Sequence, residues 1–100
     1  MTHTELVNQI LIEITAMPGV MAWKNSTGVG VTQARTVVRF GLKGSADILG
    51  VFRGRALAIE AKTGKGRQHG KQPEFQAKFQ ECGGLYILAR SVADAMEALA

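Results

Sequence analysis

Two short apolar segments joined by a two-residue turn constrain the fold more than any other feature of the sequence. Residues 46–52 and 55–62 are rich in Ile, Leu, Val and Ala, and Arg53-Gly54 lies between them. Apolar segments of this length around a tight turn that ends in glycine are typical of a β-hairpin. Pairing about the turn sets residues whose numbers sum to about 107 opposite one another, which places Asp47 across from Glu60.

Periodicity and turn signals predict the other elements. Residues 4–17 carry apolar side chains at helical spacing behind Thr4, a candidate N-cap, and Pro18-Gly19 ends this helix. We expect strands at 20–24, 36–40 and 85–89, a polar loop at 25–33, a helix at 73–82, and a helix at 92–99 capped by Ser91. The prediction is one α/β domain over residues 1–100, with helices covering a mixed central sheet in the order α-β-β-β-α-β-α.

Composition narrows the classes of protein and partner. The chain is 46% hydrophobic, which is enough for a core, and its net charge of +4 favours an acidic partner such as nucleic acid. The single cysteine, Cys82, excludes an intrachain disulfide and fits a reducing compartment. No signal peptide is evident and no apolar segment reaches the ~20 residues that span a membrane. We therefore expect a cytoplasmic protein with no membrane partner.

Three ionisable residues could form a reactive site at one end of the hairpin. Glu60 and Lys62 are two residues apart in a strand, so their side chains point to the same face, and Asp47 lies opposite Glu60. Carboxylates directly opposite one another repel, and Mg²⁺ or Mn²⁺ held by their oxygens would compensate. Lys62 could then orient or help to deprotonate a water, or stabilise charge on a phosphate. The alternative is a solvated strand edge with a surface salt bridge that contributes less than ~1 kcal/mol.

Several segments in a fixed order resemble the stand-alone VRR-NUC domain of the PD-(D/E)xK nuclease superfamily, of the phage and bacterial type. They are Trp23 to Gly28, Gly44-x-x-Asp47, Ile59-Glu60-x-Lys62, Gln72, Gly83-Gly84 and Arg90-Ser91-Val92. The resemblance runs from Glu5 to about Leu99, although Ala46 stands where the superfamily name has a proline. It implies a restriction-endonuclease-like core, with the central β-hairpin in a mixed sheet flanked by helices.

The resemblance implies a metal-dependent DNA endonuclease that acts on branched DNA such as four-way junctions. By matching positions, Asp47, Glu60 and the Ala61 carbonyl would bind Mg²⁺ or Mn²⁺, with one or two ions left open. Lys62 would be the catalytic lysine, and Gln72 would support the site or contact the substrate. The first helix often adds a glutamate; Glu5 fits this position better than Glu13, which lies roughly 12 Å further along the helix.

Basic residues beside this site favour nucleic acid as a partner. A basic, glycine-rich segment follows the strand that holds Glu60, and its side chains could contact a phosphodiester backbone. The candidate DNA contacts are Lys65, Arg67, Lys71, Lys24 and Asn25. The small size and the long apolar first helix favour a homodimer, which symmetric cutting of two strands also requires. The resemblance places the protein in the cytoplasm of a bacterium or a phage-infected host.

Neither Trp23 nor His3 is expected to take part in the chemistry, and two other functions remain open. Trp23 follows three apolar residues and is expected in the core or at a dimer contact, and His3, near a terminus, is expected to take no part in the site. A basic domain that binds DNA without cutting it is one alternative function. A metal-free interaction or scaffold subunit is the other, and it predicts no stabilisation by metal ions.

Overall fold

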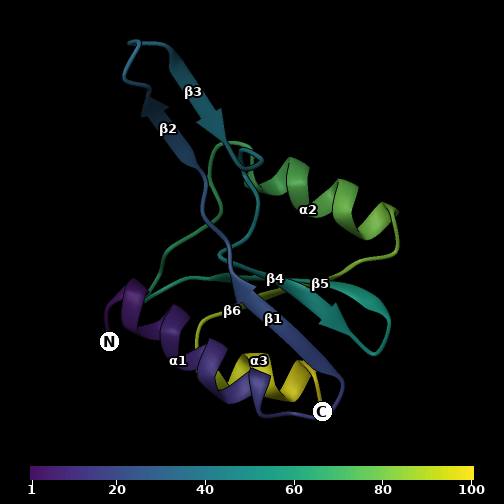
Figure 1. Ribbon diagram of the computed structural model, residues 1–100. Coiled ribbons are helices and arrows are strands. Elements are labelled where there is room, and N and C mark those ends of the chain that lie inside the picture. Colours follow the sequence, from purple (N-terminus) through teal and green to yellow (C-terminus); the bar gives the residue numbers. More distant parts are fainter.

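The computed structural model describes residues 1–100, the side chain of Phe40 excepted. Within this range the chain forms an α/β domain with a mixed four-stranded sheet, a separate two-stranded sheet and three helices (Figure 1). The elements are α1 (His3–Thr15), β1 (Val20–Lys24), β2 (Gly28–Val31), β3 (Val37–Phe40), β4 (Ile48–Phe52), β5 (Arg55–Ala61), α2 (Gln72–Glu81), β6 (Leu85–Ala89) and α3 (Val92–Ala98). The strands of the main sheet lie in the order β1-β4-β5-β6.

The central hairpin has the predicted turn and pairing. β4 and β5 are antiparallel, with Ile48 opposite Ile59, and both turn residues have positive φ, 48° at Arg53 and 82° at Gly54. Left-handed conformations at both positions produce a turn whose twist matches that of the flanking strands. β1 adds antiparallel to β4, and β6 adds parallel to β5 after the crossover through α2, so the sheet is mixed as expected.

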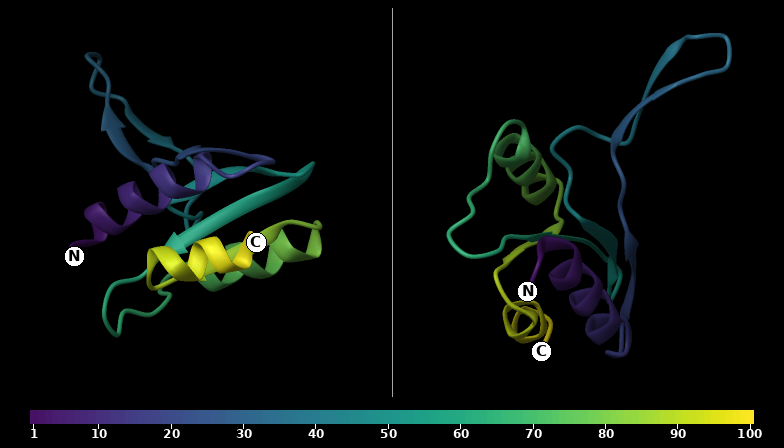
Figure 2. Two further views of the ribbon diagram at one scale, coloured as in Figure 1. Left: turned by 90° about the horizontal axis from the view of Figure 1, so that it is seen from below. Right: turned by 90° about the vertical axis from the view of Figure 1, so that its left-hand side faces the viewer.

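Helices cover both faces of the main sheet (Figure 2). α1 and α3 contact each other on one face, and α2 lies on the opposite face against β6. The apolar stripe of α1, formed by Leu6, Ile10 and Ile14, packs with Ile48 and Ile59 in the larger core cluster. On the opposite face, the aromatic rings of Phe75 and Phe79 in α2 stack with their centroids 5.3 Å apart. They pack against a smaller core cluster formed by Ala46, Ala58 and Tyr86.

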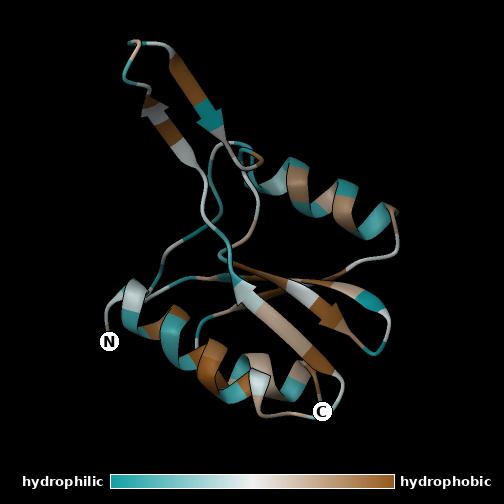
Figure 3. Ribbon diagram, viewed as in Figure 1, coloured by the Kyte–Doolittle hydropathy of each residue, from teal (hydrophilic) through white to brown (hydrophobic). Residues whose placement is uncertain are grey.

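A second hairpin, β2–β3, projects from the body and corrects the predicted element order (Figures 1 and 3). The polar loop expected at residues 25–33 instead contains β2, which pairs with β3 so that Val31 faces Val37. The glycines that alternate with valine in β2 hide its strand pattern, since glycine lowers strand propensity. Five strands therefore precede α2, where the predicted order α-β-β-β-α-β-α has three. β3 corresponds to the strand expected at residues 36–40, and β2 is the strand that the prediction missed.

Other local predictions also change. The N-cap of α1 is Thr2, not Thr4, and the helix ends at Thr15, before Pro18. Trp23 is 46% exposed, so it is not a core residue, and the alternative expectation of a dimer contact stays a prediction. Among the described residues, none of the helices combines the length and apolar character that crossing a membrane requires.

Candidate active site

Asp47 lies at the open end of the central hairpin, directly before β4, and its carboxylate extends the strand pairing. Its Oδ2 accepts a 2.8 Å hydrogen bond from the backbone N–H of Ala61, the last residue of β5. The preceding loop packs tightly against the start of α2. Gly44 has a φ of +84°, and a Cβ at that position would lie 2.5 Å from the backbone carbon of Lys71. Only glycine fits this close approach, which therefore fixes Asp47 relative to α2.

Asn25 supports the same loop from the other side. Its backbone N–H donates to the Asp47 carbonyl at 2.8 Å, and its side-chain amide donates to Ser45 Oγ at 2.7 Å and to the Ala46 carbonyl at 2.9 Å. An asparagine amide has two donor hydrogens, and these two bonds use both. Asn25 thus holds the loop that carries Asp47. The DNA contact expected of Asn25 stays a prediction.

Glu60 is a buried carboxylate with an unsatisfied oxygen. The residue is 2% exposed, and among the described residues its Oε2 has no hydrogen-bond partner. The pKa of Glu60 is raised to about 8, first because the carboxyl is buried and then because it shares a hydrogen bond with Asp47 and faces that negative charge. Nearby Lys62 only partly offsets this effect. A buried carboxylate oxygen without a partner is costly, which points to a cation as the missing partner of Oε2.

The pKa of Asp47 shifts in the opposite direction from that of Glu60. Burial works to raise the pKa of Asp47, but hydrogen bonds from the Glu60 carboxyl and the Ala61 N–H, with the charge of His3, lower it overall. The two carboxyls thus share one proton more readily than they carry two charges, as expected of carboxylates in close contact. A divalent cation that replaced the proton would allow both to ionise.

Lys62 and Gln72 meet beside the carboxylates. Lys62 is only 9% exposed, and its backbone N–H donates to the Ala89 carbonyl at 3.0 Å, so the strand pairing with β6 continues through it. Its Nζ donates a 2.9 Å hydrogen bond to Gln72 Oε1 at the start of α2, and the same oxygen accepts from the His69 backbone N–H at 3.0 Å. The structure thus brings five predicted site residues together: Asp47, Glu60, Ala61, Lys62 and Gln72.

His3 joins this group, although its place near the terminus predicts no involvement. Its Nε2 lies 3.2 Å from Asp47 Oδ2. His3, Asp47 and Glu60 each offer a ligand atom, and these atoms lie within 4.8 Å of one another. The sequence Thr2-x-x-Glu5 is a capping-box pattern, which would have placed His3 in the first turn of the helix. That pattern is the one sequence signal for its position.

The first-helix glutamates lie elsewhere. Glu5 completes the capping box: its Oε1 accepts from the Thr2 backbone N–H at 3.1 Å, and its own N–H donates to Thr2 Oγ1. The pKa of Glu5 is lowered, first by that backbone hydrogen bond and then by the Thr2 hydroxyl. Glu13 accepts from Gln9 at 3.2 Å. The structure does not bring Glu5 into the group formed by His3, Asp47 and Glu60.

The predicted DNA-contacting cations are exposed. Lys65, Arg67 and Lys71 lie in or next to the segment between β5 and α2, and Lys71 pairs with exposed Glu74 at 3.3 Å. Lys24, at the end of β1, donates to Asn8 Oδ1 at 3.4 Å. Exposed pairs of this kind contribute little to stability, so these charges remain available to a polyanion.

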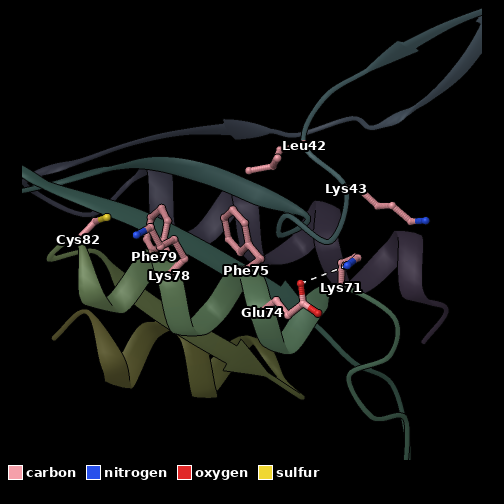
Figure 4. Close-up of a pocket in the computed structure, with 8 residues that line it drawn as sticks. All are labelled: Leu42, Lys43, Lys71, Glu74, Phe75, Lys78, Phe79 and Cys82. Carbon is pink, nitrogen blue, oxygen red and sulfur yellow. Dashed lines mark hydrogen bonds and ion pairs between the residues drawn. The ribbon is translucent and has the colours of Figure 1, made fainter.

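A separate apolar groove runs along α2 (Figure 4). It has a volume of about 500 Å³, and Leu42, Phe75, Phe79 and Cys82 form its apolar lining. Lys43, Lys71, Glu74 and Lys78 lie around it. Asp47, Glu60 and Lys62 do not line this groove, so it is a surface distinct from the candidate active site.

Comparison with known proteins leaves the family open. No protein-family model matches the chain, and no curated protein is significantly similar to it. The resemblance to VRR-NUC domains therefore remains a prediction that rests on the quoted segments, and the geometry of the site must support any functional proposal by itself.

Proposed function

We propose that the protein is a metal-dependent endonuclease that hydrolyses phosphodiester bonds in DNA. The observation that carries this proposal is the buried Glu60 carboxylate, whose Oε2 has no partner among the described residues, beside Asp47 and Lys62. In a purely structural carboxylate, each buried oxygen would be expected to have a hydrogen-bond partner. Two carboxylates and an ammonium group in one partly buried site are suited to a cation and an anionic substrate.

The donor set fits a small divalent cation. Asp47 and Glu60 offer carboxylate oxygens, and the Ala61 carbonyl is the third ligand in this proposal; Mg²⁺ and Mn²⁺ bind such oxygens and retain several waters. When bound, the ion would polarise the phosphate and lower the pKa of a coordinated water. Asp47 would be held in place by the Ala61 N–H, and Glu60 by its burial in β5.

We assign to Lys62 the roles of orienting the attacking water and stabilising negative charge on the phosphate. Its ammonium group is held 2.9 Å from Gln72 Oε1, so it cannot rotate freely away from the carboxylates. From there it can donate a hydrogen bond to an attacking water or to the developing charge on a phosphate oxygen. Gln72 is a positioning residue in this scheme, because it acts through Lys62.

The exposed cations are proposed to hold the DNA backbone. Lys65 and Arg67 lie a few residues after the active-site strand, so a DNA backbone held by them would pass close to the carboxylates.

The preference for branched DNA, the restriction-endonuclease-like fold and the bacterial or phage-infected cytoplasm rest on the VRR-NUC resemblance. The helices and the main-sheet strands support the fold, because they follow in the order α1, β1, β4, β5, α2, β6, α3.

We also propose a homodimer, with its contact surface on the β2–β3 hairpin and not, as the sequence suggested, on the first helix. The apolar stripe of α1 is buried in its own core, so it is not available to a second copy. Exposed apolar side chains instead occupy the β2–β3 hairpin, where Val29 is 57%, Val31 68% and Val37 62% exposed (Figure 3). An isolated two-stranded hairpin is at best marginally stable, so we propose that a second copy covers this valine face.

A cleavage assay tests the nuclease. Labelled four-way-junction, flap and linear duplex DNA are incubated with Mg²⁺, Mn²⁺ or EDTA, with Lys62→Ala beside the wild type. Lys78→Ala, which removes an exposed lysine of α2, is the matched control. We expect metal-dependent cutting that Lys62→Ala abolishes and Lys78→Ala preserves. Binding without cutting under every metal condition would favour the DNA-binding module. The absence of both DNA binding and stabilisation by metal ions would favour the scaffold subunit.

A further inference from the structure

His3 begins α1, yet it lies beside residues far along the chain. Its Nε2 is 3.2 Å from Asp47 Oδ2, and their side chains are 50% and 23% exposed. The capping box between Thr2 and Glu5 fixes where the helix begins, and so fixes the backbone that carries His3. The contact therefore follows from how α1 crosses the sheet and is not a chance position of a loose terminus.

We propose that His3 Nε2 is a ligand of the same divalent ion as Asp47 and Glu60. This inference rests on the metal site of the proposed function and adds a nitrogen donor to it. The three candidate ligand atoms lie within 4.8 Å of one another. Ligands on opposite sides of a Mg²⁺ or Mn²⁺ ion are separated by about twice the metal–ligand distance, ~4.2 Å. Small side-chain adjustments would therefore let all three reach one ion.

Two separate observations support a ligand over a simple surface contact. The first is the buried Glu60 Oε2, which has no partner among the described residues and belongs to the same group of atoms. The second is that Asp47 Oδ2 already accepts a hydrogen bond from the Ala61 N–H, so His3 is not needed to hold that carboxylate. A neutral imidazole with its proton on Nδ1 presents a lone pair at Nε2, the atom that faces the carboxylates.

A nitrogen ligand changes which ion the site prefers. Carboxylate, carbonyl and water oxygens suit Mg²⁺ and Mn²⁺ alike, whereas imidazole favours the transition metals over Mg²⁺. The site should therefore bind Mn²⁺ more tightly than Mg²⁺, and His3 should carry much of that preference. Without its imidazole the site keeps only oxygen ligands, so Mn²⁺ should lose more affinity than Mg²⁺.

The test uses Mn²⁺ as the probe and protein without a polyhistidine tag. Free Mn²⁺ is measured by electron paramagnetic resonance in titrations of the wild type, His3→Gln and His69→Gln. His69 is the only other histidine, is exposed, and is not in the group of candidate ligands, so it is the matched control. We expect His3→Gln to weaken Mn²⁺ binding by about tenfold or more, the scale at which loss of even an outer partner weakens a metal site, and to weaken Mg²⁺ binding less.

Pulsed measurements on the bound Mn²⁺ supply a second readout. An imidazole ligand produces ¹⁴N modulations, which we expect in the wild type and in His69→Gln and not in His3→Gln. Unchanged Mn²⁺ affinity and unchanged nitrogen modulations in folded His3→Gln would overturn the inference while leaving the carboxylate site intact. If the wild type binds neither Mn²⁺ nor Mg²⁺, the metal site of the proposed function fails as well, so the two failures are distinct.

Discussion

The ammonium group of Lys62 donates a 2.9 Å hydrogen bond to Oε1 of Gln72, which joins the residue directly after β5 to the start of α2. Lys62 is 9% exposed, and Gln72 Oε1 also accepts from the His69 backbone N–H, so the amide is held from two sides. This contact makes the position of the proposed catalytic lysine depend on a residue of another element.

The first prediction separates the two roles. Gln72→Ala should lower kcat by about 10- to 100-fold, because a lysine displaced by about 1 Å is poorly placed for the reaction. Lys62→Ala should lower it by about 10²- to 10⁴-fold, the range for loss of a proton-transfer group. Single-turnover cleavage of labelled DNA measures both.

The double variant and a control complete that test. Because Gln72 acts through Lys62, the double variant should be no slower than Lys62→Ala. Gln80→Ala, which changes an exposed glutamine of the same helix, should cut at the wild-type rate. Fully additive losses in the double variant would mean that Gln72 acts independently of the lysine.

The second prediction concerns the two functions of Asp47. Asp47→Ala leaves the buried Ala61 N–H without its acceptor, whereas Asp47→Asn keeps an oxygen that can accept this bond. Both variants should lose cleavage and metal binding. The alanine variant should also be less stable than the asparagine variant by about 1–3 kcal/mol, the cost of an unsatisfied buried group. Urea unfolding measures this difference, and equal stability of the two variants would show that the hydrogen bond does not support the fold.

The third prediction is a pH dependence of the metal-free protein. The folded pKa of Glu60, about 8, lies above its ordinary value of 4.5. Folding therefore favours the protonated carboxyl, and the stability that this gives is present below the ordinary value and lost as pH rises through the folded value. Without metal, Tm should fall by about 5 °C or more between about pH 5 and pH 8.5, given ~4–8 °C per kcal/mol for a domain of this size.

Glu60→Gln tests that explanation in two opposite directions. In metal-free buffer near about pH 8.5 the variant should melt above the wild type, because it has no buried charge to desolvate. With excess Mn²⁺ the order should reverse, since only the wild type gains stability from the ion. Glu97→Gln, which changes an exposed residue of α3, should follow the wild type in both buffers. A Glu60→Gln protein that Mn²⁺ stabilises as much as the wild type would remove Glu60 from the metal site.

The central hairpin could be predicted because its information is local. The apolar segments around Arg53-Gly54 set the turn, and the turn sets the register, which the pairing of Ile48 with Ile59 confirms. That register alone places Asp47 near Glu60. A role for Gln72 in the site is predicted only from the family resemblance, because the nine residues between Lys62 and Gln72 carry no strong periodic signal.

The position of His3 and the strand β2 could not be predicted from the sequence pattern. His3 reaches Asp47 across 44 positions, and only the path of α1 over the sheet brings them together. The strand β2 is missed for a different reason, whereas β3 is expected at residues 36–40. Gly28 and Gly30 alternate with valine in β2, so one face of the strand has no side chains that would produce a period-two pattern.

The last prediction is that the β2–β3 hairpin carries the dimer contact. Val29, Val31 and Val37 share one face of the hairpin, by alternation within β2 and by the pairing of Val31 with Val37, and all three are exposed. Replacing Val31 and Val37 with Thr keeps β-branched side chains that suit a strand but adds hydroxyls to this face. The double variant should shift from dimer to monomer at micromolar concentration, as measured by analytical ultracentrifugation, and should keep the metal-binding affinity of the wild type. Ile12→Thr, at a 62% exposed apolar position on α1, is the matched control and should stay dimeric. The reverse pattern, with only Ile12→Thr dissociating, would place the interface on α1, and a monomeric wild type would remove the dimer from the proposal.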